Sequence, residues 1–487
     1  MTVLATSPLL VPLATAFVAA FYGDRPRVQR AVSLAGVWTL LASSAALVVW
    51  VAREGTVRVA FGDWQTPFGI EFVADPLGAG MALVAAIMGT AALTFQTSDA
   101  DPAVPSPMLL PLVHALLAGV GGAFLTADLF NLYVWFEVML IASLGLLAHG
   151  AAARHLDATL KYYVLNAFGT LMLLVGVACV YGLTGHLNFM AIESATAGAE
   201  MLRWLPVVVL VTAAFLIKAG AFPVFAWLPS AYHTLPAPLL ALFAGLTTKV
   251  AVYVVLRLLR DVFVRAPDAL FEALGWVAAV TMLTGVLGAA YHWDIRRILA
   301  FHIISQIGYM LMGIALATPT GDVATIFYIV HHIIVKANLF FIAAIVCRLT
   351  GSYDLRRIGG LYAARPGLAV VFAVPALSLI GIPPLSGFWA KLLVVRESLA
   401  LGHVAWAVVA LLVGLLTLYS MTKIWFEAFW KPHPVDDWRP ATGARLGPAY
   451  GVVLSLASLT LLLGLWPEPF LQYAQTASAA PHGGGTP

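Results

Sequence analysis

Four lysines lie in the middle of long apolar segments, where a charged side chain is energetically costly. They are Lys218, Lys249, Lys336 and Lys391, and Glu137 is the one clear acidic residue at comparable depth. A lysine at the bilayer centre costs about 2.5–3.5 kcal/mol on insertion scales, so these groups must face protein, water or an opposite charge. One carboxylate cannot neutralise four ammonium groups, which argues against a purely structural ion pair. Because a lysine amine can lose its proton whereas arginine keeps its charge, the five residues predict proton transfer within the membrane.

Two histidines accompany one of these lysines. His331 and His332 lie in the same apolar segment as Lys336, and a spacing of four residues places His332 and Lys336 on one helix face. Histidine titrates near neutral pH and exchanges a proton through either ring nitrogen, which predicts a relay. A lone histidine in an apolar helix is more often a satisfied core residue. Which of the two histidines faces the lysines is left open.

A polar stripe lies in the segment DIRRILAFHIISQIGYMLMG, where His302, Ser305 and Gln306 share one face. It predicts either bound water or hydrogen bonds between helices. The two cysteines, Cys179 and Cys347, are far apart and form no CxxC motif, which excludes a cysteine-ligated zinc or iron–sulfur site. A haem bound by two histidines is a separate alternative, and a visible absorption spectrum would test it. The histidines available for it are His114, His149, His302, His331 and His332.

The composition identifies the kind of element that must position these residues. Of the 487 residues, 61% are hydrophobic and only 10% are charged, whereas a soluble domain carries about 25% charged residues. This composition excludes a soluble globular enzyme and a disordered chain. The net charge of +3 gives no electrostatic basis for nucleic-acid binding. We therefore predict an all-α polytopic membrane protein.

A membrane-spanning helix needs about 20 predominantly apolar residues. The sequence contains about fourteen such segments, joined by connections too short to hold a folded soluble domain. They span residues 7–22, 31–52, 77–97, 107–126, 129–149, 159–183, 205–228, 236–259, 269–290, 297–317, 324–348, 368–395, 402–428 and 447–466.

The seventh and twelfth segments are predicted to break close to a lysine. In AAFLIKAGAFPVFAWLP, Gly220 and Pro223 follow Lys218, and in ALSLIGIPPLSGFWAKLLVV, glycines and prolines precede Lys391. Proline removes a backbone donor and disrupts the preceding helical turn. Interrupted helices in corresponding positions are typical of transporters built from inverted repeats, with the transport site near the midplane. Packing kinks rich in glycine and proline are the alternative.

The remaining basic residues predict the orientation. With both termini outside, fifteen Lys and Arg fall in or near inner loops, and seven, including Arg257, Arg260 and Arg265, fall on the outer side. An excess of basic residues in cytoplasmic loops is the usual arrangement. We therefore expect a multi-pass protein of a bacterial plasma membrane with both termini outside.

Three segments together carry a resemblance to a known family. KAGAFPVFAWLPSAYHTLPAPLLALFAGLTTKV, DIRRILAFHIISQIGYM and GIPPLSGFWAKLLV resemble the antiporter-like subunits of respiratory complex I and of Mrp-type multisubunit cation/proton antiporters. The resemblance covers roughly residues 70–430. The segments LYSMTKIWFEAFW and KYYVLNAFGTLMLL, the compact length and the lysine at position 391 are most similar to the D-type subunits of the Mrp-type antiporters.

The resemblance implies a fold of about fourteen transmembrane helices with two inverted five-helix repeats, in which helices 7 and 12 are broken. It divides the chain into helices 1–3 in residues 1–106, a first repeat of helices 4–8 in residues 107–260, a second repeat of helices 9–13 in residues 261–430, and helix 14 with the tail in residues 431–487.

The resemblance also implies roles for the buried residues. The axis of proton transfer would consist of Glu137, Lys218, Lys249, His331, His332, Lys336 and Lys391. Glu137 and Lys218 would act as a charge switch, Lys249 would connect two half-channels, and Lys391 would be the terminal proton-transfer site. No metal, haem, flavin or quinone site is implied, so no cofactor is expected. The expected partners are other Mrp antiporter subunits in a hetero-oligomeric complex, surrounding lipid, and protons with Na⁺ or K⁺.

Three hypotheses for the function follow. The leading one is a proton-translocating subunit of a multisubunit Na⁺ or K⁺/H⁺ antiporter, hence a secondary transporter subunit and not an enzyme. The alternative is a proton-pumping membrane subunit of NADH:quinone oxidoreductase (complex I) or of a membrane-bound hydrogenase, which would make it a translocase subunit. A third is a passive scaffold within a larger complex. The identity of the co-purifying subunits would discriminate between the first two.

Overall fold

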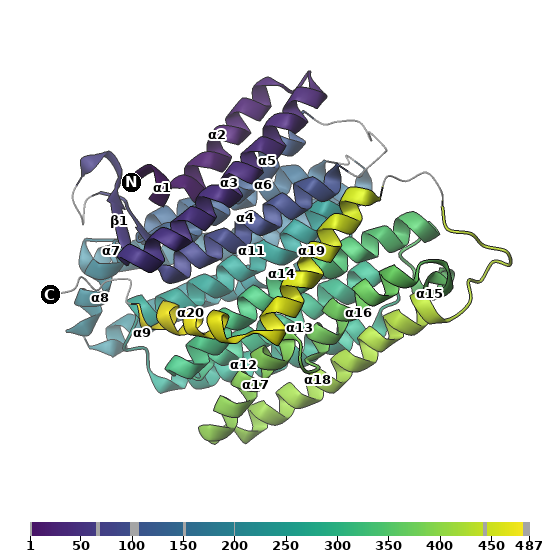
Figure 1. Ribbon diagram of the computed structural model, residues 1–487. Helices are drawn as coiled ribbons and strands as arrows, with labels where there is room; N and C mark the ends of the chain where they lie inside the picture. Colours follow the sequence, from purple (N-terminus) through teal and green to yellow (C-terminus); the bar gives the residue numbers. More distant parts are fainter. Residues whose placement is uncertain are drawn as a thin grey trace.

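The computed structural model describes residues 2–64, 69–97, 107–149, 152–198, 200–441 and 446–480. Long helices run side by side through the whole molecule (Figure 1). Within the described residues, eleven helices are long and apolar enough to cross a membrane, and three shorter apolar helices accompany them. The chain is therefore a predominantly helical, multi-pass membrane protein, as its composition predicts.

The predicted apolar segments overlap these helices. The eleven long helices are α3 (Pro26–Glu54), α4 (Pro76–Gln96), α6 (Leu129–Ala148), α7 (Ala153–Thr184), α9 (Met201–Ala219), α11 (Ala237–Arg257), α12 (Asp268–Tyr291), α13 (Ile295–Ala315), α14 (Pro319–Thr350), α18 (Val404–Ile424) and α19 (Gly447–Leu465). The three shorter apolar helices are α2 (Ser7–Phe21), α5 (Leu109–Leu125) and α16 (Pro366–Ile380). Two of the long helices, α11 and α18, continue for a π-helical turn to Val262 and Trp430.

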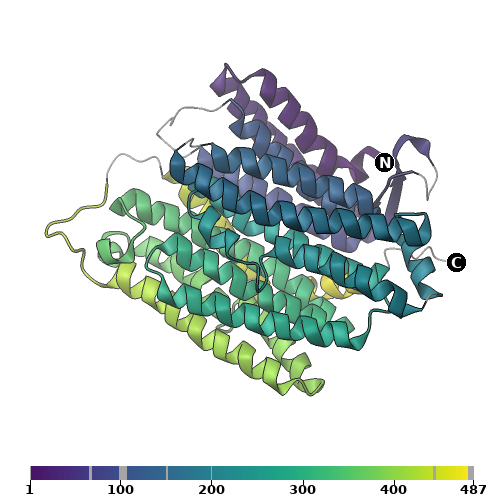
Figure 2. The same ribbon diagram turned by 180° about the vertical axis from the view of Figure 1, so that it is seen from behind.

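The remaining helical elements are short or less apolar. They are α1 (Thr2–Ala5), α8 (Phe189–Ala197), α10 (Trp227–Tyr232), α15 (Leu361–Ala364), α17 (Ser386–Ala400), α20 (Glu468–Ala479) and the 3-10 turns Phe61–Asp63 and Leu355–Arg357. The last of these helices, α20, packs against α4 and α14, where Tyr473 donates a hydrogen bond to the carbonyl of Pro76 at 2.5 Å. It lies on the front face in Figure 1, whereas α7 lies on the opposite face, which Figure 2 shows.

A small β-hairpin between α3 and α4 is a feature that the sequence did not predict. Strand β1 (Val57–Ala60) pairs antiparallel with β2 (Glu71–Ala74) over four residue pairs. Arg58 and Glu71 form an ion pair at 3.2 Å, and Asn188 at the start of α8 donates a hydrogen bond to Glu71 at 3.2 Å. These polar contacts attach the hairpin to the short helix α8 at one end of the bundle.

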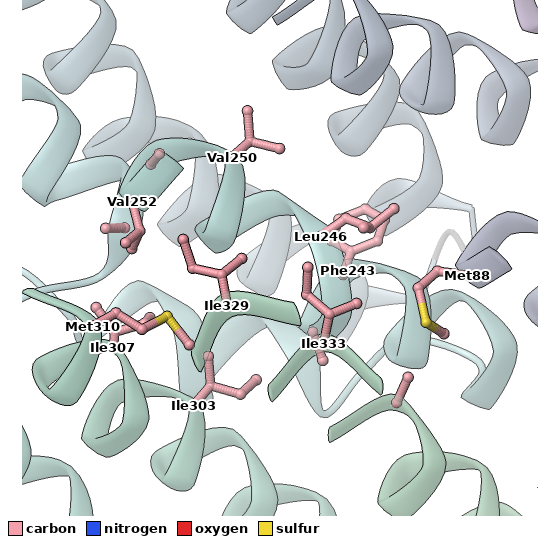
Figure 3. Packing of buried hydrophobic residues seen from close by; sticks show 14 of the residues in the cluster. Met88, Phe243, Leu246, Val250, Val252, Ile303, Ile307, Met310, Ile329 and Ile333 are labelled. Atoms are coloured by element: carbon pink, nitrogen blue, oxygen red, sulfur yellow. The ribbon is translucent and has the colours of Figure 1, made fainter. Parts of the chain in front are cut away.

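Three helices form the buried centre of the bundle. In the most apolar 18-residue stretch of each of α11, α13 and α14, 94% of the residues are buried. The corresponding value for α3 is 28%. Figure 3 shows Ile329 and Ile333 of α14 among Leu246 and Val250 of α11 and Ile303 of α13. Because these helices are surrounded by others, polar side chains on them face protein and not lipid.

The seventh predicted segment is broken as expected. Helix α9 ends at Ala219, where Gly220 adopts a left-handed conformation with φ of 76°, and α10 begins at Trp227. Glycine adopts this conformation without the steric cost that other residues incur. Lys218 consequently lies in the last turn of α9, next to the break.

The twelfth predicted segment is broken in the same way. Helix α16 ends at Ile380, Gly381 is left-handed with φ of 98°, and α17 begins at Ser386. Lys391 lies in the second turn of α17. Each of the two breaks therefore positions a lysine next to a helix terminus.

Candidate functional site

His331, His332 and Lys336 lie on α14 in the buried centre. None of the three side chains is more than 1% exposed. Successive helical residues are rotated by about 100° about the helix axis, so His332 and Lys336 share a face while His331 points elsewhere. The two histidines therefore contact different helices.

His332 and Lys336 form a cluster with Lys249 of α11. The charges of Lys249 and Lys336 act on His332, and the charge of Lys249 acts on Lys336. Lys249 is fully buried and donates a hydrogen bond to the carbonyl of Ala244 on its own helix. Both ring nitrogens of His332 and Nζ of Lys336 have no hydrogen-bond partner among the described residues. Because buried polar groups are nearly always hydrogen-bonded, these atoms are suited to bind internal water.

His331 faces the second helix break. Its Nδ1 lies 2.8 Å from Oγ of Ser386, which in turn lies 3.0 Å from Oγ of Ser378 on α16. His331 also lies within electrostatic range of Lys391 and of Lys336. His331 is therefore directed at the region of Lys391, whereas His332 is directed at the cluster between α11 and α14.

Lys391 bridges the two halves of the broken helix. Its Nζ donates a hydrogen bond to the carbonyl of Ile380 at 2.8 Å and lies 5.0 Å from the ring centre of Tyr309 on α13. The last carbonyls of a helix lack intrahelical donors and carry the negative end of the helix dipole. The ammonium group of Lys391 therefore caps α16, and this contact is strongest when the lysine is charged.

Lys218 and Glu137 form a separate group between α6, α7 and α9. Nζ of Lys218 donates a hydrogen bond to Oγ1 of Thr170 at 2.6 Å and lies 5.2 Å from the ring centre of Phe136. Glu137 interacts with Lys218 electrostatically, but these two described side chains form no direct ion pair. One carboxylate oxygen of Glu137 is buried and has no partner within the described part of the chain. The two side chains are thus close enough to interact without direct contact.

A cavity of about 20 Å³ lies beside Lys218. Its polar lining is completed by Tyr162 and Asn166 of α7 and Thr247 of α11. A polar cavity of this size has room for one water molecule. Thr247 is two residues before Lys249 on α11, so the cavity extends from the first lysine towards the helix that carries the second.

The structure brings the predicted residues together in two groups. The first consists of Glu137 and Lys218, and the second consists of Lys249, His331, His332, Lys336 and Lys391. Helix α11 packs against both α9 and α14 and thereby lies between the groups. Among the residues that the structure describes, no hydrogen bond joins one group to the other.

The polar stripe on α13 forms hydrogen bonds between helices. Nε2 of His302 lies 2.6 Å from Oγ of Ser420 on α18, and Tyr328 of α14 donates to Oε1 of Gln306 at 2.6 Å. The hydroxyl of Ser305 has no partner in the described ranges. Of the two alternatives for this stripe, the structure therefore supports interhelical hydrogen bonding for His302 and Gln306.

Arg257, counted above among the basic residues of the outer side, lies at the end of α11 and is buried. It is 2% exposed and donates to both carboxylate oxygens of Asp75 at 2.6 and 2.8 Å. It also donates to Asp261 at 3.0 Å and to the hydroxyl of Tyr253 at 2.8 Å. Counting basic residues along the sequence does not separate a paired, buried arginine from a loop arginine, because the partner Asp75 is 182 residues away.

Comparison with known proteins identifies the family. Residues 126–417 match the transmembrane region that defines the NADH:quinone oxidoreductase/Mrp antiporter family. The chain belongs to this family. Two relatives, each named as the D-type subunit of an Na(+)/H(+) antiporter, extend the match over nearly the whole length. The protein of Alkalihalophilus pseudofirmus is 40% identical over 96% of this chain and 94% of its own, and that of Bacillus subtilis is 34% identical over 96% and 95%.

A solved structure agrees with this assignment to the NADH:quinone oxidoreductase/Mrp antiporter family. A chain of the Mrp complex from Dietzia sp. DQ12-45-1b superposes with a TM-score of 0.90 at 34% identity, covering 98% of this chain and 97% of that chain. The resemblance to the D-type subunits of the Mrp-type antiporters is thereby confirmed.

The hydroxyl residues of the site were not predicted from the sequence. Thr170, Ser378 and Ser386 contact Lys218 or His331 directly or through one another. Serine and threonine in helices commonly hydrogen-bond to carbonyls of their own helix, so their presence alone carries no functional signal. For Ser378 and Ser386, the one available signal was their position on either side of the predicted break.

Proposed function

We propose that the protein is the proton-translocating subunit of a multisubunit antiporter that exchanges Na⁺ or K⁺ for protons. The observation that carries the proposal is the burial of four titratable side chains, with Lys391 half-buried beside them, in one region between α11, α14 and the break of α16 and α17. The names of the two relatives, both D-type subunits of Na(+)/H(+) antiporters, support this assignment. The other subunits of such a complex are the partners of this chain.

Each buried titratable group in turn binds a proton and releases it to the neighbouring group. The proposed order is Glu137, Lys218, Lys249, His332, Lys336, His331 and Lys391. Ammonium groups that lie close together at low dielectric repel each other, so a proton gained at one group favours release from the next. Glu137 sets the charge of Lys218, and Lys391 exchanges the proton at the far end of the axis.

The fold supports a transporter with two related halves. We assign fourteen membrane crossings, with one inverted repeat in residues 107–260 and the other in residues 261–430, flanked by helices 1–3 in residues 1–106 and by helix 14 with the tail in residues 431–487. The two broken helices, each with a lysine beside the break, support this division. The ratio of inner to outer basic residues is fifteen to seven. This ratio favours both termini on the outside of a bacterial plasma membrane.

Purification of the intact complex tests the proposed function. A tagged copy of this chain is expected to co-purify with other membrane subunits and without flavin or iron–sulfur subunits. Everted membrane vesicles that contain the complex should lose a preformed pH gradient on addition of Na⁺ or K⁺, measured by recovery of acridine orange fluorescence. Co-purification of redox subunits, or vesicles that respond to neither cation, would contradict the proposal.

Replacing Thr170 by valine is expected to slow antiport about tenfold. Thr170 accepts the hydrogen bond of Lys218 at 2.6 Å, and leaving a buried charged donor without an acceptor costs about 1–3 kcal/mol, where 1.4 kcal/mol is tenfold. The initial rate of gradient loss, normalised to the amount of assembled complex, measures the effect. The matched control is Thr159→Val on the same helix, because the Thr159 hydroxyl donates only to the carbonyl of His155. Equal rates for the two variants would contradict the role of Thr170.

A further inference from the structure

We propose that Ser378 and Ser386 are positioning residues that link the protonation state of His331 to the helix break beside Lys391. The inference rests on the proposed function, in which His331 and Lys391 exchange protons. Among the described residues neither serine forms a hydrogen bond with a lysine, and both act through the histidine.

The two serines form a continuous hydrogen-bonded chain across three helices. The backbone N–H of Gly387 in α17 donates to Oγ of Ser378 in α16 at 3.1 Å. Oγ of Ser378 lies 3.0 Å from Oγ of Ser386, which lies 2.8 Å from Nδ1 of His331 in α14. Ser378, Ser386 and His331 are each at most 1% exposed, so bulk water does not compete for these contacts.

When His331 is neutral and accepts at Nδ1, every contact of the chain is satisfied in one direction, starting from the amide of Gly387. Gly387 supplies an amide proton, so Oγ of Ser378 accepts it and has its own proton free for Ser386. Ser386 then donates its proton to Nδ1 of His331. In this order His331 is neutral and carries its proton on Nε2, because the partner of one ring nitrogen fixes the tautomer.

Protonation of His331 requires this order to reverse. Both ring nitrogens of a charged histidine are donors, so Nδ1 can no longer accept from Ser386. Ser386 must turn its proton towards Ser378, and Ser378 must redirect its own. The arrival of one proton on His331 is thereby transmitted through two hydroxyl groups to the end of α16.

The break is built so that this rearrangement reaches both half-helices. A Cβ atom on Gly387 would lie 1.8 Å from the carbonyl oxygen of Ser378, so α16 and α17 touch at this point with no intervening side chain. The same end of α16 presents the carbonyl of Ile380 to Nζ of Lys391 at 2.8 Å. The C-terminal end of α16 therefore has two sets of contacts. The serine pair connects it to His331, and the ammonium group of Lys391 binds its last carbonyl.

Substitution of the serines in the assembled complex tests the inference. Ser386→Ala and Ser378→Ala are expected to lower the rate of antiport about tenfold, and Ser386→Thr, which keeps the hydroxyl, is expected to restore most of it. The matched control is Ser398→Ala, because Ser398 is equally buried in α17 but donates to the carbonyl of Val394 on its own helix at 2.8 Å. If Ser386→Ala impairs assembly, Ser386→Cys gives the same comparison, since a thiol is a weak donor of similar shape.

A double-mutant cycle separates a positioning role from a packing role. In a His331→Ala background, Ser386→Ala is expected to have no further effect, because residues that act through one another are not additive. Equal effects of Ser386→Ala in both backgrounds, or a wild-type rate for Ser386→Ala, would overturn the inference. Loss of antiport in Glu137→Ala together with a wild-type rate in Ser386→Ala would leave the proposed function standing. Wild-type rates in Glu137→Ala, His331→Ala and Ser386→Ala alike would overturn both.

Discussion

Alanine at position 137 or 218 is expected to lower antiport at least a hundredfold while the complex still assembles. The ammonium group of Lys218 has one hydrogen bond, to Thr170, and its nearby opposite charge is Glu137. In the proposed axis, Lys218→Ala removes the proton carrier of the first step, and Glu137→Ala removes the charge that controls it. A hundredfold loss corresponds to about 2.7 kcal/mol at 1.36 kcal/mol per factor of ten. The measurement is cation-induced loss of the pH gradient in everted vesicles, per amount of assembled complex.

An exposed lysine provides the control for this experiment. Lys161 lies on α7, is 54% exposed, and pairs with Asp157 at 2.6 Å. Lys161→Ala should transport at the wild-type rate, because exposed ion pairs of this kind contribute little. A wild-type rate in Glu137→Ala or Lys218→Ala would contradict the proposed axis. Loss of the whole complex in these two variants would instead favour a scaffolding role.

Replacing Arg257 by alanine is expected to destabilise the protein by about 3–5 kcal/mol, the range measured when one partner of a buried ion pair is removed. The carboxylate of Asp75 is fully buried and receives two hydrogen bonds from Arg257. Without the guanidinium group, this carboxylate would lose two hydrogen bonds and its ion-pair partner. The expected result is a strong reduction of the thermal midpoint in detergent and of the amount of protein in the membrane.

A second substitution distinguishes charge compensation from packing. Arg257→Met combined with Asp75→Asn removes both charges, and the asparagine oxygen can still accept from the amide of Gly78 at the start of α4. The double variant should regain most of the lost stability, because an apolar replacement of a whole ion pair is often neutral. Arg356→Ala, which removes an exposed partner of Asp354, should leave the thermal midpoint unchanged. A wild-type midpoint for Arg257→Ala would show that the ion pair does not stabilise the fold.

The sequence was sufficient to locate the buried lysines and the breaks. An apolar run around Lys249 or Lys336 indicates burial, and glycine and proline beside Lys218 and Lys391 indicate a discontinuous helix, because each signal is local. Which of His331 and His332 faces the other lysines could not be decided from the local sequence. Helical periodicity shows that the two rings diverge, but which neighbouring helix each one meets depends on how α11, α14 and α17 pack.

Contacts between distant segments were not predictable from the sequence for the same reason. The partners Asp75 and Arg257 are separated by 182 residues, and Ser386 meets His331 across 55. Short elements such as the β-hairpin and α20 also escaped prediction. A two-stranded hairpin is marginally stable alone, and α20 is held by packing against α4 and α14, so neither is marked by a long apolar run.

The separation of the titratable residues into two groups has a consequence for leakage. A membrane that stores a proton gradient is discharged by any pathway that conducts at all times, and an uninterrupted hydrogen-bonded row would be such a pathway. Here no hydrogen bond joins Lys218 to Lys249 among the described residues, and a cavity with room for one water molecule lies beside Lys218. Immobilising a water costs about 0–2 kcal/mol, and 100 mV delivers about 2.3 kcal/mol to each proton. In the proposed axis, the free energy needed to hydrate this one position is therefore no larger than the free energy that drives each proton across the membrane.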